Sequence, residues 1–287
     1  MRKVKIMVKR ILIFFYFIYE VVMLAAVRGK VVPVRFFNAR PNVGDALNIY
    51  IIQKISGRKI FEVKSGMLQH VLGIGSIMHL GTANSVAWGT GIIESKRIPN
   101  NSTLKKMSFS AVRGKKTKDI IGEVIGGKLT CPMGDPAVLM PLFYTPKNKK
   151  YYSIGIVPHY VDKETEAFKN FLLKSKAKLI DVELPVEDFL DSLAECDVIL
   201  SSSLHGLILS DSYNIPNVWV RFSDEVIGGD FKFLDYYSTT DLKEASPIDL
   251  REKECDANII KDLLSRAKVA KFTEDKGILL DAFPSRL

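Results

Sequence analysis

The segment SSSLHG, residues 201–206, places hydroxyl groups and an imidazole directly after an apolar run of the chain. Ser202, Ser203 and the backbone around Gly206 could donate hydrogen bonds to an anion at the start of a following helix. Histidine is the side chain most readily tuned to exchange protons near neutral pH, so His205 is a candidate general acid or base. A structural histidine bonded to a neighbouring carbonyl group is the alternative, and the spacing leaves both open.

The segment PNVGDALN, residues 41–48, places a glycine and an aspartate at the start of another predicted helix. Asn42, Gly44 and the N–H groups beside them could face a ligand, while Asp45 contacts or deprotonates a hydroxyl group. In the alternative interpretation, Asp45 is only the N-terminal cap of the helix and Gly44 only a turn. The spacing alone does not separate the two.

Three more segments follow predicted strands and could line the same cleft. In GIGS, Gly75 and Ser76 could let the backbone approach a phosphate, although the sequence holds neither a full dinucleotide fingerprint nor a P-loop. Arg113 could bind a carboxylate or phosphate through two parallel hydrogen bonds, and a surface salt bridge is the alternative. His159 lies just after a further strand.

The sequence predicts no metal site and no cofactor. It holds no HExxH motif, and Cys131, Cys196 and Cys255 are far apart without the spacing of metal ligands. Cysteines of this number and spacing are typical of reduced thiols in a cytoplasmic protein. His70 and His79 are expected to be structural.

The positive charge of the chain is concentrated at its N-terminus. Residues 1–30 hold seven basic residues and one acidic residue. Together these residues account for two thirds of the net charge of +9. No basic stripe with interleaved aromatic residues is evident in the rest of the chain. The sequence therefore argues against a nucleic-acid partner.

Residues 11–27 are apolar except for Glu20 and follow five basic residues. As a helix they would span roughly 26 Å, slightly less than a hydrocarbon core of about 30 Å. A helix lying on the membrane surface, a short signal anchor, a secretory signal peptide and an ordinary buried helix are all compatible with this pattern. We favour a membrane-associating helix over residues 1–29.

Beyond residue 30, short β-branched runs alternate with amphipathic segments, which is typical of α/β proteins with parallel sheets. The polar stretch YTPKNKK, residues 144–150, is the best candidate for a linker. We therefore predict two doubly wound, Rossmann-like domains over residues 30–145 and 151–287. Their ligand would bind where the carboxyl ends of strands from both domains meet.

Eight segments, in this order, resemble blocks of the polysaccharide pyruvyl transferase family, in particular its bacterial branch of exopolysaccharide ketal pyruvyltransferases. The resemblance covers roughly residues 33–240. The segments are NVGDALN, GIGS, VAWGTGI, AVRG, GDPAVLMP, PHYVD, SSSLHGLILSDSYNIPNVWV and GGDFKFLDYYS.

This resemblance implies a two-domain fold similar to GT-B glycosyltransferases. It also implies transfer of pyruvate from phosphoenolpyruvate to two hydroxyl groups of a sugar, which forms a cyclic ketal. Carried onto this chain, Arg113, Leu204, His205 and the residue before Leu204 would form the donor pocket. Some members of the family have arginine where this chain has Ser203, which removes one permanent positive charge from the pocket.

From the resemblance and the residues together we expect a cytoplasmic enzyme, peripheral to the inner membrane, that acts on a polysaccharide or its lipid-linked precursor. His205 would serve as acid and base, and Asp45 would orient or deprotonate the acceptor hydroxyl. A GT-B type glycosyltransferase that uses a nucleotide sugar is the nearest alternative. A membrane-associated assembly factor with a degenerate transferase fold is a third, non-enzymatic one.

Overall fold

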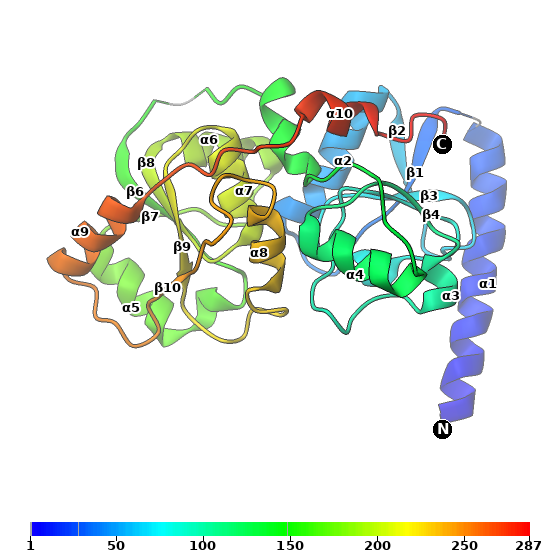
Figure 1. Ribbon diagram of the computed structural model, residues 1–287, viewed down its shortest axis with the longest axis horizontal. Coiled ribbons are helices and arrows are strands. Elements are labelled where there is room, and N and C mark those ends of the chain that lie inside the picture. The colour runs from blue at the N-terminus through cyan, green and yellow to red at the C-terminus, as the bar shows by residue number, and fades with distance from the viewer. Residues whose placement is uncertain (1, 28, 148) are drawn as a thin grey trace.

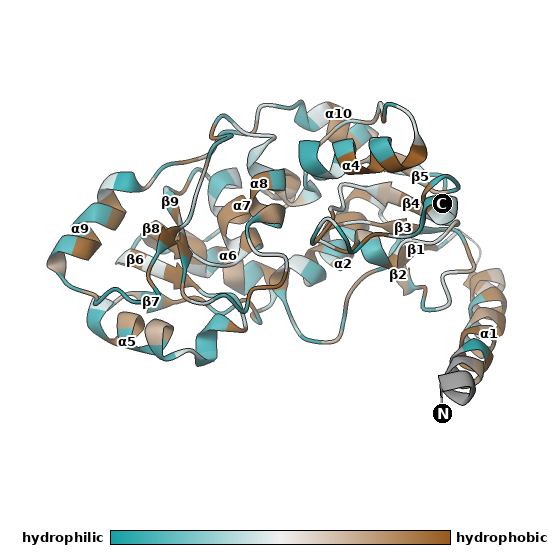
Figure 2. Cartoon of the chain, turned by 60° about the horizontal axis from the view of Figure 1, so that its bottom comes forward, coloured by the Kyte–Doolittle hydropathy of each residue, from teal (hydrophilic) through white to brown (hydrophobic). Residues whose placement is uncertain are grey.

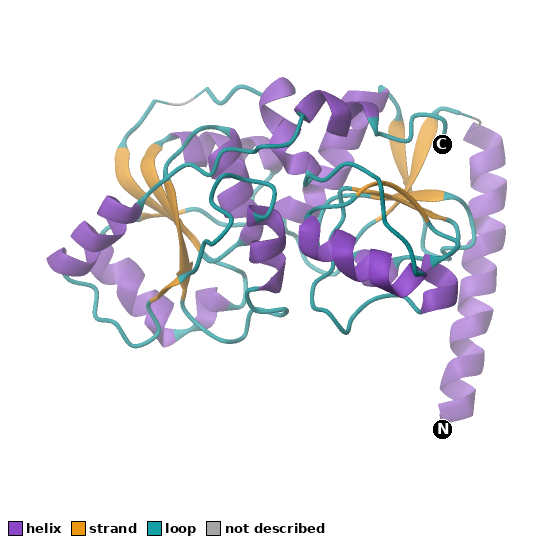
Figure 3. Cartoon of the chain, in the orientation of Figure 1, coloured by secondary structure: helices purple, strands orange, loops and turns teal. Residues whose placement is uncertain are grey.

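The chain folds into two α/β units that lie side by side, each built around one five-stranded parallel sheet (Figures 1 and 3). The structure is a computed structural model that describes residues 2–27, 29–147 and 149–287. The α/β class and the two parallel sheets are confirmed. Three positions of the predicted N-terminal segment and linker, Met1, Arg28 and Asn148, lie outside the described residues.

The sheet of the first unit has the strand order β2-β1-β3-β4-β5, with every pairing parallel. Its strands are β1 (Val31–Arg35), β2 (Lys59–Glu62), β3 (His70–Leu72), β4 (Ser85–Trp88) and β5 (Ser108–Ala111). Its helices are α2 (Val43–Ser56), η1 (Met78–Leu80), α3 (Asn101–Leu104), α4 (Lys115–Ile125) and η2 (Pro136–Leu142). The register pairs Val34 with Val71 across β1 and β3.

The sheet of the second unit has the order β10-β9-β8-β6-β7 and is also parallel throughout. Its strands are β6 (Tyr152–Val157), β7 (Lys178–Leu179), β8 (Cys196–Ser201), β9 (Asn217–Arg221) and β10 (Ile248–Asp249). Its helices are η3 (Asp162–Glu164), α5 (Glu166–Ser175), α6 (Val186–Ala194), α7 (Leu204–Ser212), α8 (Phe231–Tyr237) and α9 (Ala257–Arg266). Numbered within its own unit, each sheet has the strand order 2-1-3-4-5.

That shared order fixes where a ligand can bind. In each sheet the direction in which strands are added reverses between the first and third strands, which are β1 and β3 in one unit and β6 and β8 in the other. Loops that leave the carboxyl ends of such a strand pair diverge and open a crevice. The two crevices are the positions at which the fold places a binding site.

Helices α2 and α7 begin beside these crevices. The Asn42 side chain caps α2 by accepting a hydrogen bond of 2.8 Å from the Gly44 N–H, and Gly57 ends the helix in the left-handed conformation. Helix α7 follows β8 directly, and its first eight residues are buried. A helix that is buried on all sides in this way is enclosed by protein rather than lying on the surface.

Buried polar contacts join the two units. The Arg113 guanidinium donates from Nε to a carboxylate oxygen of Asp235 at 2.9 Å, and both side chains are fully buried. The Asp235 carboxylate also accepts hydrogen bonds from the N–H and the hydroxyl of Thr117. A buried carboxylate must be paired and hydrogen-bonded to be tolerated, so these contacts fix α4 against α8.

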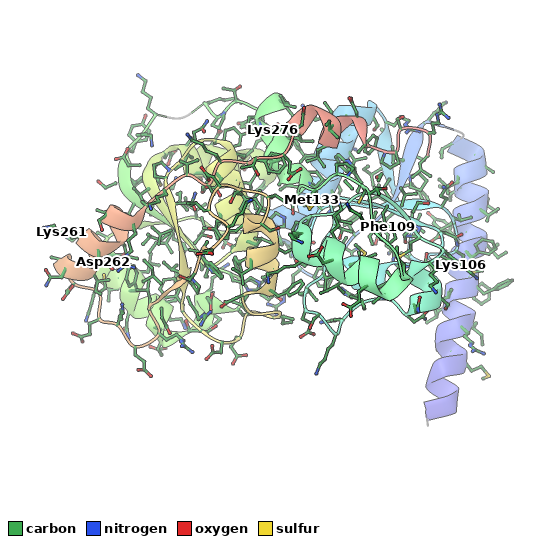
Figure 4. All side chains as sticks on the ribbon, in the orientation of Figure 1. Lys106, Phe109, Met133, Lys261, Asp262 and Lys276 are labelled. Atoms are coloured by element: carbon green, nitrogen blue, oxygen red, sulfur yellow. The ribbon has the colours of Figure 1, made fainter. Side chains whose placement is uncertain are left out.

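The end of the chain returns to the first unit. From α9, where Lys261 and Asp262 lie at the far edge of the second unit, the chain runs to Lys276 at the start of α10 (Figure 4). Helix α10 (Lys276–Asp281) packs on the first unit, where the Trp88 indole donates to the Leu279 carbonyl at 2.9 Å. The predicted division at residues 151–287 did not include this return.

Helix α1 (Arg2–Val27) stands at the edge of the first unit and carries mainly apolar residues (Figure 2). It is the single helix, among the residues that the structure describes, that is long and apolar enough to cross a membrane. The qualifying window is Arg10–Val27, and almost none of it is buried in the protein.

Candidate active site

One cavity of about 190 Å³ receives residues from both crevices. From the first unit, Asn42 and Asp45 follow β1, and Gly75 and Ser76 follow β3. From the second unit, residues 159–160 follow β6 and residues 203–205 follow β8. Most of the residues that the sequence singled out therefore lie around one space. Its lining also includes Phe37, Ile77, His79, Ile93, Arg97, Ile227 and Lys232.

His205 lies at the junction of the two units. Its Nε2 atom is 3.6 Å from Oδ2 of Asp135, and neither of these buried atoms has a hydrogen-bond partner among the described residues. The other edge of the ring meets the start of α2, where a Cβ atom added to Gly44 would lie 2.0 Å from Nδ1. Glycine at position 44 is thus required by the close approach of His205, which is a packing role that the turn interpretation did not include.

Asp45 faces His205 without capping its own helix. Asn42 is the cap of α2, so the alternative in which Asp45 caps it is wrong. Burial raises the pKa of the Asp45 carboxyl to about 6, and the attraction of His205 opposes that rise. A carboxyl with this pKa can exchange protons near neutral pH, which fits an acid or base.

Lys232 brings a positive charge into the cavity. Its side chain is buried, and burial lowers the pKa of its ammonium group to about 8, aided by the nearby charge of Arg113. Burial and the charge of Lys232 also lower the pKa of His159 to about 3, so the imidazole of His159 is neutral at physiological pH. His159 can therefore donate or accept a hydrogen bond but adds no charge.

Arg113 reaches the cavity only through another residue. Its three nitrogen donors contact Asp235, the Ser76 hydroxyl at 2.5 Å and the Ile92 carbonyl, and the side chain is fully buried. Its ion pair is buried, so the alternative of a surface salt bridge is wrong. Arg113 is also absent from the cavity lining, whereas we predicted that it would bind the donor directly. Its guanidinium orients Ser76, which does line the cavity.

The segment SSSLHG divides into residues that face the cavity and residues that support them. Ser203, Leu204 and His205 line it. The Ser202 hydroxyl instead bonds to Asp162 at 2.5 Å and to the His159 N–H at 2.9 Å. Gly206 lies against the ends of β8 and β6, because a Cβ there would lie 2.4 Å from Ser201 Oγ and 2.8 Å from the Val157 side chain. In this structure Ser202 and Gly206 hold neighbours in place.

Sequence reasoning missed Lys232, Asp135 and Arg97. Lys232 and Asp135 lie within the segments GGDFKFLDYYS and GDPAVLMP, so the signal was present, but their burial depends on tertiary contacts. Arg97 is an exposed residue at the cavity rim. His79, expected to be structural, also lines the cavity, whereas His70 bonds to Leu68 and Ser85 as a structural histidine does.

Among the described residues, no group of three or more His, Cys, Asp or Glu side chains is arranged to hold a metal ion. The prediction that the protein needs neither metal nor cofactor stays a prediction.

Comparisons with known proteins identify the family of this chain. The sequence model of the family described as polysaccharide pyruvyl transferase matches residues 42–224, which include the start of α2 and the segment SSSLHG. An uncharacterised protein of Acanthamoeba polyphaga mimivirus is 31% identical over 254 residues, which are 85% of this chain and 84% of the relative. This chain belongs to the polysaccharide pyruvyl transferase family.

Proposed function

We propose that the protein transfers pyruvate from phosphoenolpyruvate to two hydroxyl groups of a saccharide and so forms a cyclic ketal. The observation that carries this proposal is the meeting of Lys232, the start of α7, Asp45 and His205 around one cavity. Lys232 and the start of α7 suit an anion, and Asp45 and His205 are groups that can move protons. We further propose that the two units form a GT-B-like pair.

The donor would bind between Lys232 and the start of α7. Phosphoenolpyruvate carries a carboxylate and a phosphate, and the free N–H groups at a helix start favour such anions. Lys232 supplies a buried cation, and Arg97 supplies a second at the rim. The cavity of about 190 Å³ has room for a three-carbon donor.

Proton transfer would centre on His205. Its Nε2 atom is enclosed beside Asp135, so Nδ1, on the side of Gly44, is the nitrogen left to exchange a proton with substrate. Asp45 lies on this same side, and its raised pKa suits removal of a proton from the acceptor hydroxyl.

Atoms and electrons balance in this transfer. A proton goes to the methylene carbon of the donor, and the first sugar oxygen bonds to the central carbon. The bond from that carbon to the phosphate oxygen breaks, and inorganic phosphate leaves. The second sugar oxygen then bonds to the same carbon. One hydroxyl proton ends on the new methyl group and the other on phosphate.

Donor binding tests the proposal directly. Titration calorimetry should show that phosphoenolpyruvate binds and that UDP-sugars do not, and Lys232→Gln should weaken binding at least about ten-fold, as for loss of a buried charged hydrogen bond. Lys169→Gln changes a lysine that is half exposed on α5 and should leave binding unchanged. Binding of a UDP-sugar in place of phosphoenolpyruvate would favour the glycosyltransferase alternative.

The pH dependence of binding adds an independent check. Since the pKa of Lys232 is about 8, the ammonium loses its charge above that pH and affinity for the donor should fall. In Lys232→Gln this fall should be absent. Affinity that stays flat in the wild-type protein between about pH 7 and about pH 9.5 would contradict the role of Lys232.

The location and acceptor are also proposed. A cytoplasmic enzyme peripheral to the inner membrane would meet a lipid-linked saccharide at that surface, and α1 is the element that supports this location. Phosphate release from phosphoenolpyruvate with a panel of sugar diols would identify the acceptor. A membrane-associated assembly factor, in contrast, would release no phosphate with any acceptor.

A further inference from the structure

Helix α1 is fixed to the first unit by Glu20, the one acidic residue in its apolar run. The Glu20 carboxylate is 1% exposed and accepts hydrogen bonds from the N–H groups of Lys64 at 2.7 Å and Ser65 at 2.9 Å. It also accepts one from the Ser65 hydroxyl. The Tyr19 ring stacks on Phe61 of β2 with 6.4 Å between centroids. These contacts fix how the helix is rotated about its own axis.

The opposite face of α1 is an apolar stripe. Ile11, Phe15, Ile18 and Val22 recur at intervals of three and four residues, so they lie on one face about half a turn from Glu20. Their exposed fractions run from 45% to 66%. On the side of Glu20, Ile13 and Phe17 are only partly exposed. Leu12, Phe14 and Tyr19, on the flanks of this stripe, are 52% to 57% exposed as well. Helix α1 therefore turns its polar contact inward and exposes apolar residues over the rest of its surface.

The charge at the N-terminal end of α1 indicates what covers this stripe. Five of the first ten residues are basic, and none is acidic. Basic residues next to an anionic lipid surface contribute about 1 kcal/mol each, and a helix with an apolar face binds with that face in the boundary between headgroups and acyl chains. A lipid surface with negative headgroups matches both the stripe and the charge.

We propose that α1 lies in the plane of an anionic bilayer, with the stripe Ile11, Phe15, Ile18 and Val22 in the lipid. Glu20 holds the rest of the molecule on the polar side. This deepens the location part of the proposed function, and rests on it only for which membrane is bound.

The same contacts argue against a spanning helix. If α1 crossed the bilayer, Glu20 and the adjoining Lys64 and Arg35 would be carried to hydrocarbon depth along with the loop that holds them. The Lys64 side chain is 49% exposed in its present position. Charged residues at that depth cost about 2.5–3.5 kcal/mol each on insertion scales. An in-plane helix keeps all of these groups on the water side.

Vesicle flotation with the full-length protein tests the surface. The protein should bind vesicles that contain phosphatidylglycerol and bind neutral phosphatidylcholine vesicles far less. The double variant Phe15→Gln, Val22→Gln should lower the partition coefficient about ten-fold or more, since it removes buried apolar area. Leu173→Gln, which changes an 81% exposed leucine on α5, should leave it unchanged.

Flotation and catalysis can fail separately. Lys232→Gln should bind vesicles as the wild type does, because Lys232 lines the cavity and is not part of α1. A wild-type protein that binds the donor but does not bind anionic vesicles would overturn the inference about α1 and spare the proposed transfer. The reverse result would spare α1 and overturn the transfer.

A labelling experiment separates an in-plane helix from a spanning one. In membrane vesicles sealed with the cytoplasmic face outward, an Arg10→Cys variant that also carries Cys255→Ser should react with an impermeant maleimide without detergent. Cys131 and Cys196 are buried and serve as internal controls. Reaction only after detergent would overturn the proposal, as would sedimentation showing that the stripe holds two copies together and binds no vesicles.

Discussion

His205 lies between two carboxylates of the first unit that differ in their surroundings. Asp135 is fully buried and approaches Nε2, while Asp45 lines the cavity and has its pKa raised to about 6 by burial. The 3.6 Å between Nε2 and Oδ2 of Asp135 is longer than a hydrogen bond, so this carboxylate acts on the imidazole by its charge and leaves Nδ1 for substrate. We therefore propose Asp135 as a positioning residue and Asp45 as the group that contacts the acceptor.

Asp135→Asn tests this division of roles. Asparagine keeps an oxygen to accept the 3.0 Å hydrogen bond from Ala137 N–H that caps η2, but it removes the charge beside His205. We expect the turnover number for phosphate release to fall about 100-fold or more while the KM for phosphoenolpyruvate changes little. Its pH profile should change as well, which a purely structural role would not cause.

Asp256→Asn is the matched control, since Asp256 caps α9 in the same way on the surface. It should leave both the turnover and the pH profile unchanged. Wild-type turnover in a folded Asp135→Asn protein would remove Asp135 from the reaction.

The raised pKa of Asp45 predicts how stability depends on pH. The pKa of this carboxyl is about 3.9 in the unfolded chain and about 6 in the folded protein. Its contribution to the free energy of unfolding is therefore fully present below about pH 4 and is lost as the pH rises through about 6. The free energy of unfolding of Asp45→Asn should therefore be about 2 kcal/mol higher than that of wild type at about pH 7.5. At about pH 4 the two values should be close.

Urea unfolding at the two pH values measures this difference. Asp197→Asn, on an exposed aspartate, should show the same small effect at both. An effect of Asp45→Asn that does not change with pH would mean that burial does not raise this pKa. The variant should also lose transfer activity, because stability gained at the expense of activity is typical of active-site residues.

At the scale of elements, the sequence predicted what is local. Short β-branched runs predicted the segments that form β1, β3, β4, β5, β6, β7, β8 and β9. The short edge strands β2 and β10 were missed, because few residues carry their pattern. The site residues that follow buried strands were found, since parallel topology brings strand ends together. Lys232 was missed because its burial on α8 is decided by packing.

The packing of helix α10 on the first unit was likewise not predicted from the sequence. Leu279 is fully buried, and its carbonyl accepts a hydrogen bond from the Trp88 indole, whereas its neighbour Ile278 is 56% exposed. Leu279→Ala should lower the free energy of unfolding by about 2–5 kcal/mol, because it leaves a cavity in the first unit. Ile278→Ala should change it by less than about 1 kcal/mol. Equal effects in thermal unfolding would mean that α10 does not pack on the first unit in solution.

At the scale of the whole molecule, the site exists only where the two units meet. Gly44 and Asp45 come from one unit and His205 and Lys232 from the other, while the Val43 N–H donates to the Val182 carbonyl across the boundary at 2.6 Å. The buried pair of Arg113 and Asp235 holds the units together beside the cavity. A small change in how the units approach would separate Asp45 from His205, and Gly44 is the position where this can be tested.

Gly44→Ala adds a methyl group where a Cβ would lie 2.0 Å from Nδ1 of His205, so either the imidazole or the unit that carries it must move. The new side chain should cost about 1–3 kcal/mol of stability and lower turnover about 100-fold, since a displacement of about 1 Å disrupts proton transfer. Gly127→Ala is the control, because nothing lies within 4 Å of a Cβ there. Donor affinity in Gly44→Ala should change less than turnover, because Lys232 is not displaced by the methyl group itself. Phosphate-release kinetics measure the turnover, donor titration measures the affinity, and thermal unfolding measures the stability. A Gly44→Ala enzyme with wild-type turnover would show that His205 does not approach α2 in the active protein.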